Sequence, residues 1–199
     1  MKYAKMLALL AVAAVAAMAF AATASATTVT SPKGTAYTGV IKATNEGSLT
    51  LHGVVDITCN HSEVEGSVES HGAGVTAKGA ITKLTFTQCN QHVTIISKGS
   101  LEAHQVAGST TDGTLTSSNA KVTVVATTIF GAVHCVFATN NTHIGRLTAT
   151  AGGGSHATLD IDSSPIPVVG SESDFLCGSS SEWTGNYKVN TPTDLHISA

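Results

Sequence analysis

The residues best suited to metal chemistry are nine histidines, spread along the chain from His52 to His196. A transition-metal site needs two or three such side chains on one surface at ligand distance. The sequence contains no HxH or HExxH spacing, and its cysteines show no CxxC or CxxH spacing. We therefore predict scattered, solvent-facing histidines, no metal site and no bound cofactor.

Carboxylates at alternate positions offer a second kind of chemistry. Asp160 and Asp162 are expected on one face of a strand, together with His156. Two carboxylates about 5–9 Å apart can hydrolyse a glycosidic bond, but any residues two positions apart on a strand meet that spacing. No GxSxG turn accompanies them. We predict no catalytic residue and a protein that is not an enzyme. An extracellular enzyme whose site is assembled from separate loops is the alternative.

Sugar binding requires an exposed aromatic ring as a stacking surface. Trp183 and Tyr187 share the apolar face of their strand, so we expect them to be buried, whereas Tyr37 is less constrained. The candidate binding face is therefore Tyr37 with the polar positions His156, Asp160 and Asp162.

These side chains must be positioned by strands, because the chain after residue 26 is rich in Thr, Ser, Val and Gly and shows no amphipathic helix. Apolar and polar residues alternate at 157–162 and 183–189, as on half-buried strands. The segments 92–97 and 121–130 are apolar on both faces and are expected to be central strands. We predict an all-β fold: one antiparallel β-sandwich or flattened barrel of roughly a dozen short strands.

The N-terminus carries an export signal. Lys2 and Lys5 precede an uncharged apolar run at 7–22, and Ala24-Ser25-Ala26 matches the small-x-small cleavage pattern. We predict a signal peptide at 1–26, cleavage after Ala26 and a secreted, extracellular domain at 27–199. An uncleaved membrane anchor is less favoured, because a spanning helix needs about 20 apolar residues.

Loss of the signal peptide makes the chain more acidic. Without Lys2 and Lys5 the formal net charge changes from −3 to −5. An acidic surface disfavours nucleic acid as a partner. No second apolar run follows, so we expect no stable membrane insertion.

The four cysteines, Cys59, Cys89, Cys135 and Cys177, all lie in the part expected to be exported. An even number in an oxidising compartment predicts disulfides, and four cysteines allow three connectivities. A loose internal repeat places two cysteines in each half of the chain. The local pairing Cys59–Cys89 and Cys135–Cys177 is therefore the preferred one.

Three segments resemble a group of small exported bacterial proteins of unknown function. They are SPKGTAYTGVIKA at 31–43, TCN at 58–60, and Cys177-Gly178 followed by Trp183-x-Gly185-x-Tyr187-x-Val189-x-Thr191-Pro192. The resemblance implies export and a β-rich domain, and it transfers no catalytic residue.

Together these observations predict a secreted, non-enzymatic protein with a structural or ligand-binding role at the cell envelope. A cell-envelope polysaccharide is the expected kind of partner. A self-assembling exported β protein is a further alternative, and the sequence does not predict an oligomeric state.

Overall fold

The structure is a computed structural model that describes residues 27–32, 34–72, 75–129, 131–149 and 156–198. The predicted signal peptide and its cleavage site at Ala26 lie outside the described residues.

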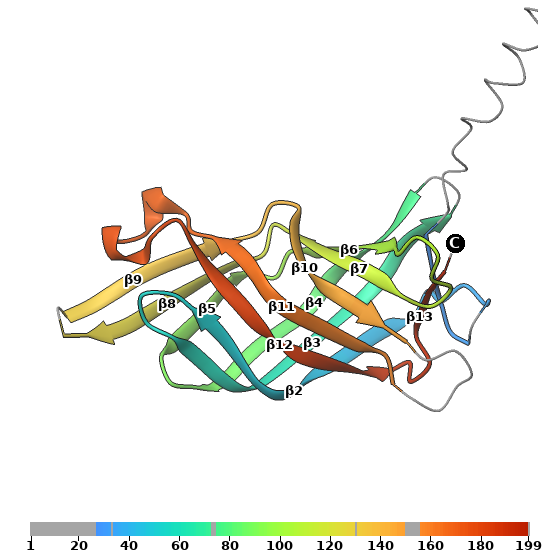
Figure 1. Ribbon diagram of the computed structural model, residues 1–199, viewed down its shortest axis with the longest axis horizontal. Helices are drawn as coiled ribbons and strands as arrows, with labels where there is room; N and C mark the ends of the chain where they lie inside the picture. Colours follow the sequence, from blue (N-terminus) through green and yellow to red (C-terminus); the bar gives the residue numbers. More distant parts are fainter. Residues whose placement is uncertain (1–26, 33, 73–74, 130, 150–155, 199) are drawn as a thin grey trace, which may run out of the picture.

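Eight antiparallel strands close into a barrel in the order β10-β11-β12-β2-β3-β4-β6-β7, as Figure 1 shows. Their bounds are β2 Val40–His52, β3 Ile57–Gly72, β4 Val75–Cys89, β6 Ser100–Gln105, β7 Gly113–Ser118, β10 Thr142–Thr148, β11 Thr158–Pro167 and β12 Ser180–Thr191. The predicted all-β antiparallel fold is confirmed, and of the two predicted architectures the barrel is the one that forms.

Alternation along the strands separates an apolar interior from a charged exterior. On β12, Tyr187 and Val189 are buried inside the barrel, as their shared face predicted. The outward positions carry ion pairs between neighbouring strands, such as Lys42 with Glu65 at 3.2 Å and Lys78 with Glu102 at 2.9 Å. The barrel therefore turns its charged side chains to water.

Beyond one end of the barrel, three further strands form a separate sheet, called here the cap sheet. It consists of β5 (His92–Ser97), β8 (Lys121–Thr128) and β9 (Gly131–Ala138), in the order β5-β8-β9. These strands are continuous with β6, β7 and β10, which neighbour one another in the same order. Each connection contains one residue with left-handed backbone, namely Gly99, Asn119 and Asn141. Because that conformation cannot extend a strand, the sheet bends there.

The cap sheet tests the expectation that 92–97 and 121–130 form central strands. β8 lies between β5 and β9 and is central within this sheet. β5 is an edge strand instead, and residue Ile96 is 60% exposed. The prediction for 92–97 was wrong because an apolar run does not show which of its faces another layer will cover.

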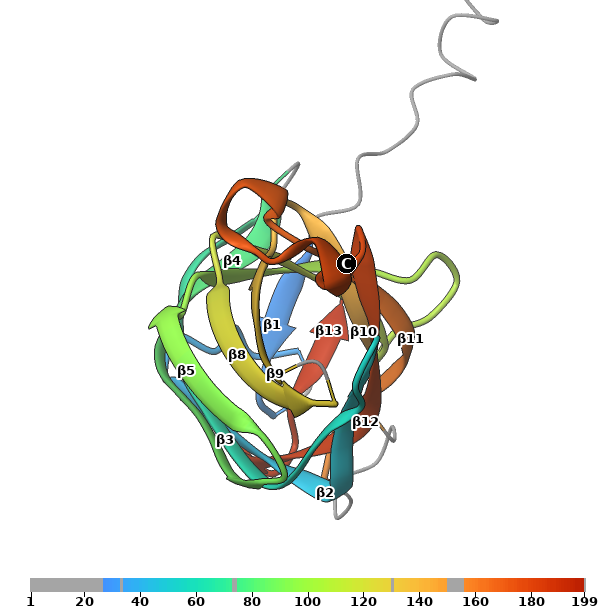
Figure 2. The same cartoon turned by 90° about the vertical axis from the view of Figure 1, so that its left-hand side faces the viewer.

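The opposite end of the barrel is filled by a short two-stranded ribbon, called here the end ribbon. It pairs β1 (Thr28–Thr30) with β13 (His196–Ser198) and buries Val29, Leu195 and Ile197. Figure 2 looks into the barrel from the cap-sheet end, with β8 and β9 in front and the end ribbon behind. The two small sheets thus lie at opposite ends of the barrel.

Asp112 holds the barrel wall beside the end ribbon. Its carboxylate accepts hydrogen bonds from Arg146 Nη2 at 2.8 Å and from Thr111 Oγ1 at 3.0 Å. The carbonyl of Thr111 accepts the backbone N–H of Ile197 at 3.0 Å. Burial acts to raise the pKa of Asp112, but the hydrogen bonds from Arg146, the Ala149 backbone and Thr111 outweigh it, so the pKa lies below its usual value.

Two glycines mark places where barrel strands approach each other too closely for a side chain. A Cβ on Gly79 would lie 2.3 Å from the carbonyl oxygen of Ser67, and one on Gly145 would lie 2.1 Å from that of Asp160. The pairing of β3 with β4 and the pairing of β10 with β7 each shift register near these residues. Such irregularities increase strand twist and help a sheet curve into a barrel.

Disulfides join Cys59 to Cys89 and Cys135 to Cys177, the two local pairs that the sequence favoured. The first links directly opposed residues of β3 and β4. The second links β9 of the cap sheet to the short 3₁₀ helix η2 (Phe175–Cys177), which follows η1 (Gly170–Glu172). Two disulfides are compatible with an extracellular protein.

Candidate functional site: the barrel interior

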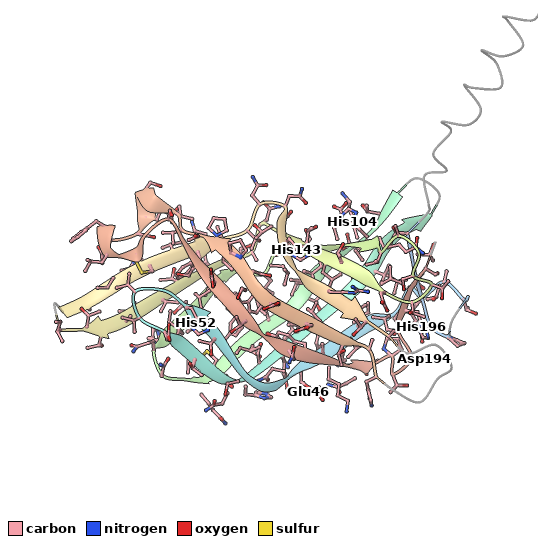
Figure 3. All side chains as sticks on the ribbon, viewed as in Figure 1. Glu46, His52, His104, His143, Asp194 and His196 are labelled. Atoms are coloured by element: carbon pink, nitrogen blue, oxygen red, sulfur yellow. A yellow bond between two sulfur atoms is a disulfide. The ribbon has the colours of Figure 1, made fainter. Side chains whose placement is uncertain are left out.

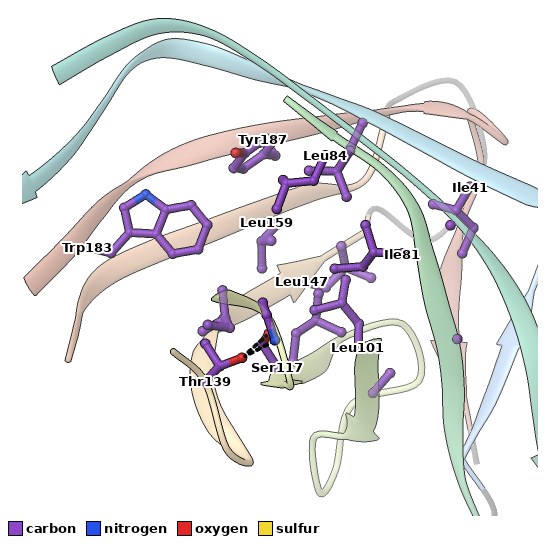
Figure 4. A pocket seen from close by; sticks show the side chains of 18 of the residues that line it. Ile41, Ile81, Leu84, Leu101, Ser117, Thr139, Leu147, Leu159, Trp183 and Tyr187 are labelled. Atoms are coloured by element: carbon purple, nitrogen blue, oxygen red, sulfur yellow. Dashed lines mark hydrogen bonds between the residues drawn. The ribbon is translucent and has the colours of Figure 1, made fainter. Parts of the chain in front are cut away.

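The interior of the barrel contains a cavity of about 260 Å³, shown in Figure 4. All eight barrel strands contribute to its lining, together with residues of the cap sheet and the end ribbon. The lining is almost wholly aliphatic and aromatic. Eight-stranded barrels are just wide enough either to be filled by their own side chains or to hold one small ligand. Here the side chains do not fill the interior.

The cavity lies between two clusters of packed apolar side chains. One cluster, nearer the cap sheet, includes Val124, Phe137 and Tyr187. The other includes Val29 and Ile197 of the end ribbon. Members of both clusters line the cavity.

Small inward-facing residues account for the open space. Ala77 and Ala103 occupy buried inward positions on neighbouring strands, β4 and β6, and Ala43 lines the cavity from β2. Ala43 packs against both clusters, which places it between them. Because alanine carries a single side-chain carbon, these positions leave volume that leucine or isoleucine would occupy.

Three aromatic rings form one wall of the cavity. Trp183 packs edge-on against Phe86, with ring centroids 6.4 Å apart, and against Tyr187 at 6.3 Å. All three residues line the cavity. Trp183 is the single tryptophan of the chain, so its fluorescence reports on this wall alone.

The hydroxyl group of Tyr187 bonds to another side chain of the protein. It forms a buried hydrogen bond of 2.7 Å with Ser62 Oγ. Burial raises the pKa of the phenol, and the hydrogen bond with Ser62 offsets only part of that effect. The phenol is therefore neutral and serves as a fixed part of the wall.

A second hydroxyl pair interrupts the apolar lining. Ser117 at the end of β7 and Thr139 just after β9 both line the cavity, and their side-chain oxygens lie 3.0 Å apart. Figure 4 shows this hydrogen bond among the surrounding leucine side chains. Thr139 Oγ1 also accepts the backbone N–H of Ala120 at 3.1 Å. The pair is thus fixed at the level where the strands bend into the cap sheet.

The lining offers no counter-ion to a charged ligand. Lys78 is the one lining residue whose side chain is charged at neutral pH, among those that the structure describes. Its ammonium pairs with Glu102 on the outer surface, and its side chain is 54% exposed. Placing an unpaired charge in an apolar interior is strongly unfavourable, so the cavity suits an uncharged molecule.

One part of the wall lacks backbone pairing. β4 pairs with β6 only over Ala77–Ala80, and β5 pairs only with β8. Between described residues, no ladder therefore joins the second half of β4 to β5, although the two strands are consecutive. Leu84 and Phe86 of β4 and Val93 of β5 line the cavity beside this seam.

None of the four residues of the predicted binding face is among the residues that line the cavity. Tyr37 packs against the cluster near the end ribbon, and its hydroxyl donates to the carbonyl of Val40 at 2.9 Å. His156 Nδ1 lies 2.7 Å from the carbonyl oxygen of Val189, whereas Asp160 and Asp162 are exposed on β11. No hydrogen bond or ion pair between described residues joins Tyr37 to the other three. The four residues remain a predicted face.

The histidines are spread along the whole molecule. Figure 3 shows His52 toward the cap-sheet end, His143 in the middle, and His104 and His196 toward the end ribbon. Among the described residues no group of three or more histidine, cysteine or acidic side chains could hold a metal ion. His196 departs from the expected solvent-facing pattern, because it is buried in the end ribbon.

Sequence reasoning identified the inward faces but missed the cavity. Alternation at 157–162 and 183–189 places Leu159, Trp183 and Tyr187 on one face, and all three line the cavity. The signal that was overlooked is residue size, because Ala43, Ala77 and Ala103 occupy inward positions where a packed core favours larger side chains. Ser117 and Thr139 gave no sequence signal in so threonine-rich a chain.

Within the part of the chain that the structure describes, no helix has the length and apolar character needed to cross a lipid bilayer. Comparison of the chain with protein-family models, with curated proteins and with solved structures gives no match.

Proposed function

We propose that this protein binds a small, uncharged, mainly apolar molecule inside its barrel. The observation that carries the proposal is the cavity of about 260 Å³ with its apolar lining. Binding sites for small molecules are typically concave, apolar and largely preformed, with few polar groups. The proposal narrows the predicted structural or ligand-binding role to ligand binding.

The size of the cavity sets the scale of the ligand. An apolar cavity of about 150 Å³ holds benzene. By the same measure, a cavity of about 260 Å³ holds roughly ten non-hydrogen atoms, the size of a molecule with two fused rings. Larger lipids would not fit within the space between the two clusters.

The distribution of polar side chains across the barrel wall favours a water-exposed protein that carries such a ligand. Ion pairs such as Lys42–Glu65 lie on the outer face, while the inner face is apolar. Barrels that span membranes have the reverse arrangement, with an apolar outer band. Together with the predicted export, this arrangement favours an extracellular carrier or receptor for a poorly water-soluble compound.

The test is a titration of the purified protein with indane, an uncharged hydrocarbon of two fused rings. We expect saturable binding of one indane per barrel by calorimetry, with a parallel change in Trp183 fluorescence. Ala43→Leu should weaken binding at least tenfold, because leucine would extend into the cavity. Lys42→Leu places the same side chain one residue away on the outer face and should leave binding unchanged. Absence of saturable indane binding to the unmodified protein would overturn the proposal.

A further inference from the structure

Ser117 and Thr139 place a pair of hydroxyl groups in an otherwise apolar lining. The two residues are buried, with 4% and 9% of their surface exposed. Backbone hydrogen bonds hold Thr139 in place: Asn119 N donates to Thr139 O at 2.8 Å, and Thr139 N donates to Ala120 O at 2.9 Å. Ser117 is held within β7, where it pairs with Leu101 of β6 and Thr142 of β10. Their position is therefore set by the bend between the barrel and the cap sheet.

One of the two hydroxyl protons of this pair is not used in a hydrogen bond between described residues. Each hydroxyl has one proton to donate and can accept two hydrogen bonds. Thr139 Oγ1 accepts from Ala120 N, and the bond between Thr139 and Ser117 uses one of the two protons. Whichever hydroxyl donates, the other has no acceptor among the described residues.

An O–H group that faces an apolar cavity without an acceptor is unfavourable. A ligand atom with a lone pair, such as a ketone, ether or hydroxyl oxygen, would accept that proton. A ligand carboxylate would also accept it, but the lining provides no cation to balance the charge. The chemistry of the pair therefore selects a neutral acceptor.

We infer that the barrel recognises a neutral, two-ring-sized apolar molecule carrying one hydrogen-bond acceptor, which the Ser117–Thr139 pair binds through its unused hydroxyl proton. This inference rests on the proposed function, because it names the chemical class of the ligand held in the same cavity. The apolar lining supplies most of the affinity, and the hydroxyl pair selects among apolar compounds of similar size.

The experiment compares indane with indanone, which has the same two rings and a ketone oxygen that can only accept a hydrogen bond. Calorimetry gives the ratio of the two affinities for each protein variant. Relative to the unmodified protein, the double variant Ser117→Ala/Thr139→Val should lower the indanone-to-indane ratio by about fivefold, the loss expected for one neutral hydrogen bond. Thr139→Ser keeps both hydroxyls and should leave the ratio unchanged. An anionic indane carboxylate should bind at least tenfold more weakly than indanone.

A second measurement needs no variant. The carbonyl stretching band of indanone bound to the unmodified protein should lie below its position in hexane, because a carbonyl that accepts a hydrogen bond absorbs at lower frequency. An unshifted band, or an affinity ratio that the double variant does not change while indane still binds, would overturn the inference and leave the proposed function intact. If indane does not bind to the unmodified protein, the proposed function itself fails.

Discussion

Replacing Ala43 with leucine should make the protein more stable, although the residue lies inside the barrel. Ala43 lies between the two apolar clusters and lines the cavity. Leucine adds three carbon atoms, and each buried methylene stabilises the folded state by about 0.8 kcal/mol. Fixing the longer side chain costs about 0.5–1 kcal/mol of rotamer entropy. The expected net gain in the free energy of unfolding is about 1–2 kcal/mol.

Urea denaturation followed by circular dichroism measures this change. The sign of the effect is decisive, because the same substitution in a well-packed interior costs about 1–3 kcal/mol through overpacking. Lys42→Leu is the matched control, and its outward side chain should change stability by no more than about 0.5 kcal/mol. If Ala43→Leu lowers the free energy of unfolding by about 1 kcal/mol or more, the interior is already filled in solution and the reasoning from the cavity is refuted.

Three further predictions concern the groups that hold the barrel together. Asp112→Asn should lower the free energy of unfolding by about 1 kcal/mol at neutral pH. Because the pKa of Asp112 is depressed in the folded state, this difference in stability should decrease as the pH falls below about 3.9, the pKa of an unfolded aspartate, and should vanish near pH 2. Urea denaturation at a series of pH values measures it. Tyr187→Phe leaves the buried hydroxyl of Ser62 without its partner and should cost about 1–3 kcal/mol in urea denaturation, part of which Ser62→Ala restores. Replacing both Cys135 and Cys177 with serine opens a link across 42 residues and should cost about 4 kcal/mol by chain entropy, measured by urea denaturation of both proteins without reductant.

Each of these three predictions has its own contrary outcome. A stability difference for Asp112→Asn that persists unchanged to pH 2 would show that the carboxylate charge is not its source. An unaffected Tyr187→Phe variant would mean that Ser62 finds another partner. A cost below about 1 kcal/mol for the double serine variant would show that the Cys135–Cys177 disulfide constrains the unfolded chain little.

Local patterns in the sequence determine much of the fold. Alternation places Leu159 and Asp160 on opposite faces of their strand, and Tyr187 and Lys188 on opposite faces of theirs. This pattern is a property of a few consecutive residues and can be read directly from the sequence. Local disulfide pairing is likewise favoured by the spacing of Cys59 and Cys89. Such signals depend only on near neighbours in the chain.

Closure of the barrel depends on partners that are distant in the sequence. β2 pairs with β12, where Leu51 lies opposite Trp183, and no local pattern specifies that register. An amphipathic strand buries its apolar face equally well against a second sheet or across the interior of a barrel. The sequence could therefore predict inward faces without predicting that they surround a cavity.

The bends at Gly99, Asn119 and Asn141 divide the continuous strands into two regions with different hydrogen-bonding networks. The closed barrel pairs each of its strands on both sides. Among the described residues, the cap sheet instead ends in the unpaired edge of β5, and its other edge, β9, is held by the backbone N–H groups of Val169 and Asp174 and by the disulfide to Cys177. Native-state hydrogen exchange should accordingly resolve two cooperative units. Amides of β5 and β8 will exchange by a partial opening that leaves the amides of β2, β3 and β12 protected, so the cap region can open while the barrel remains folded.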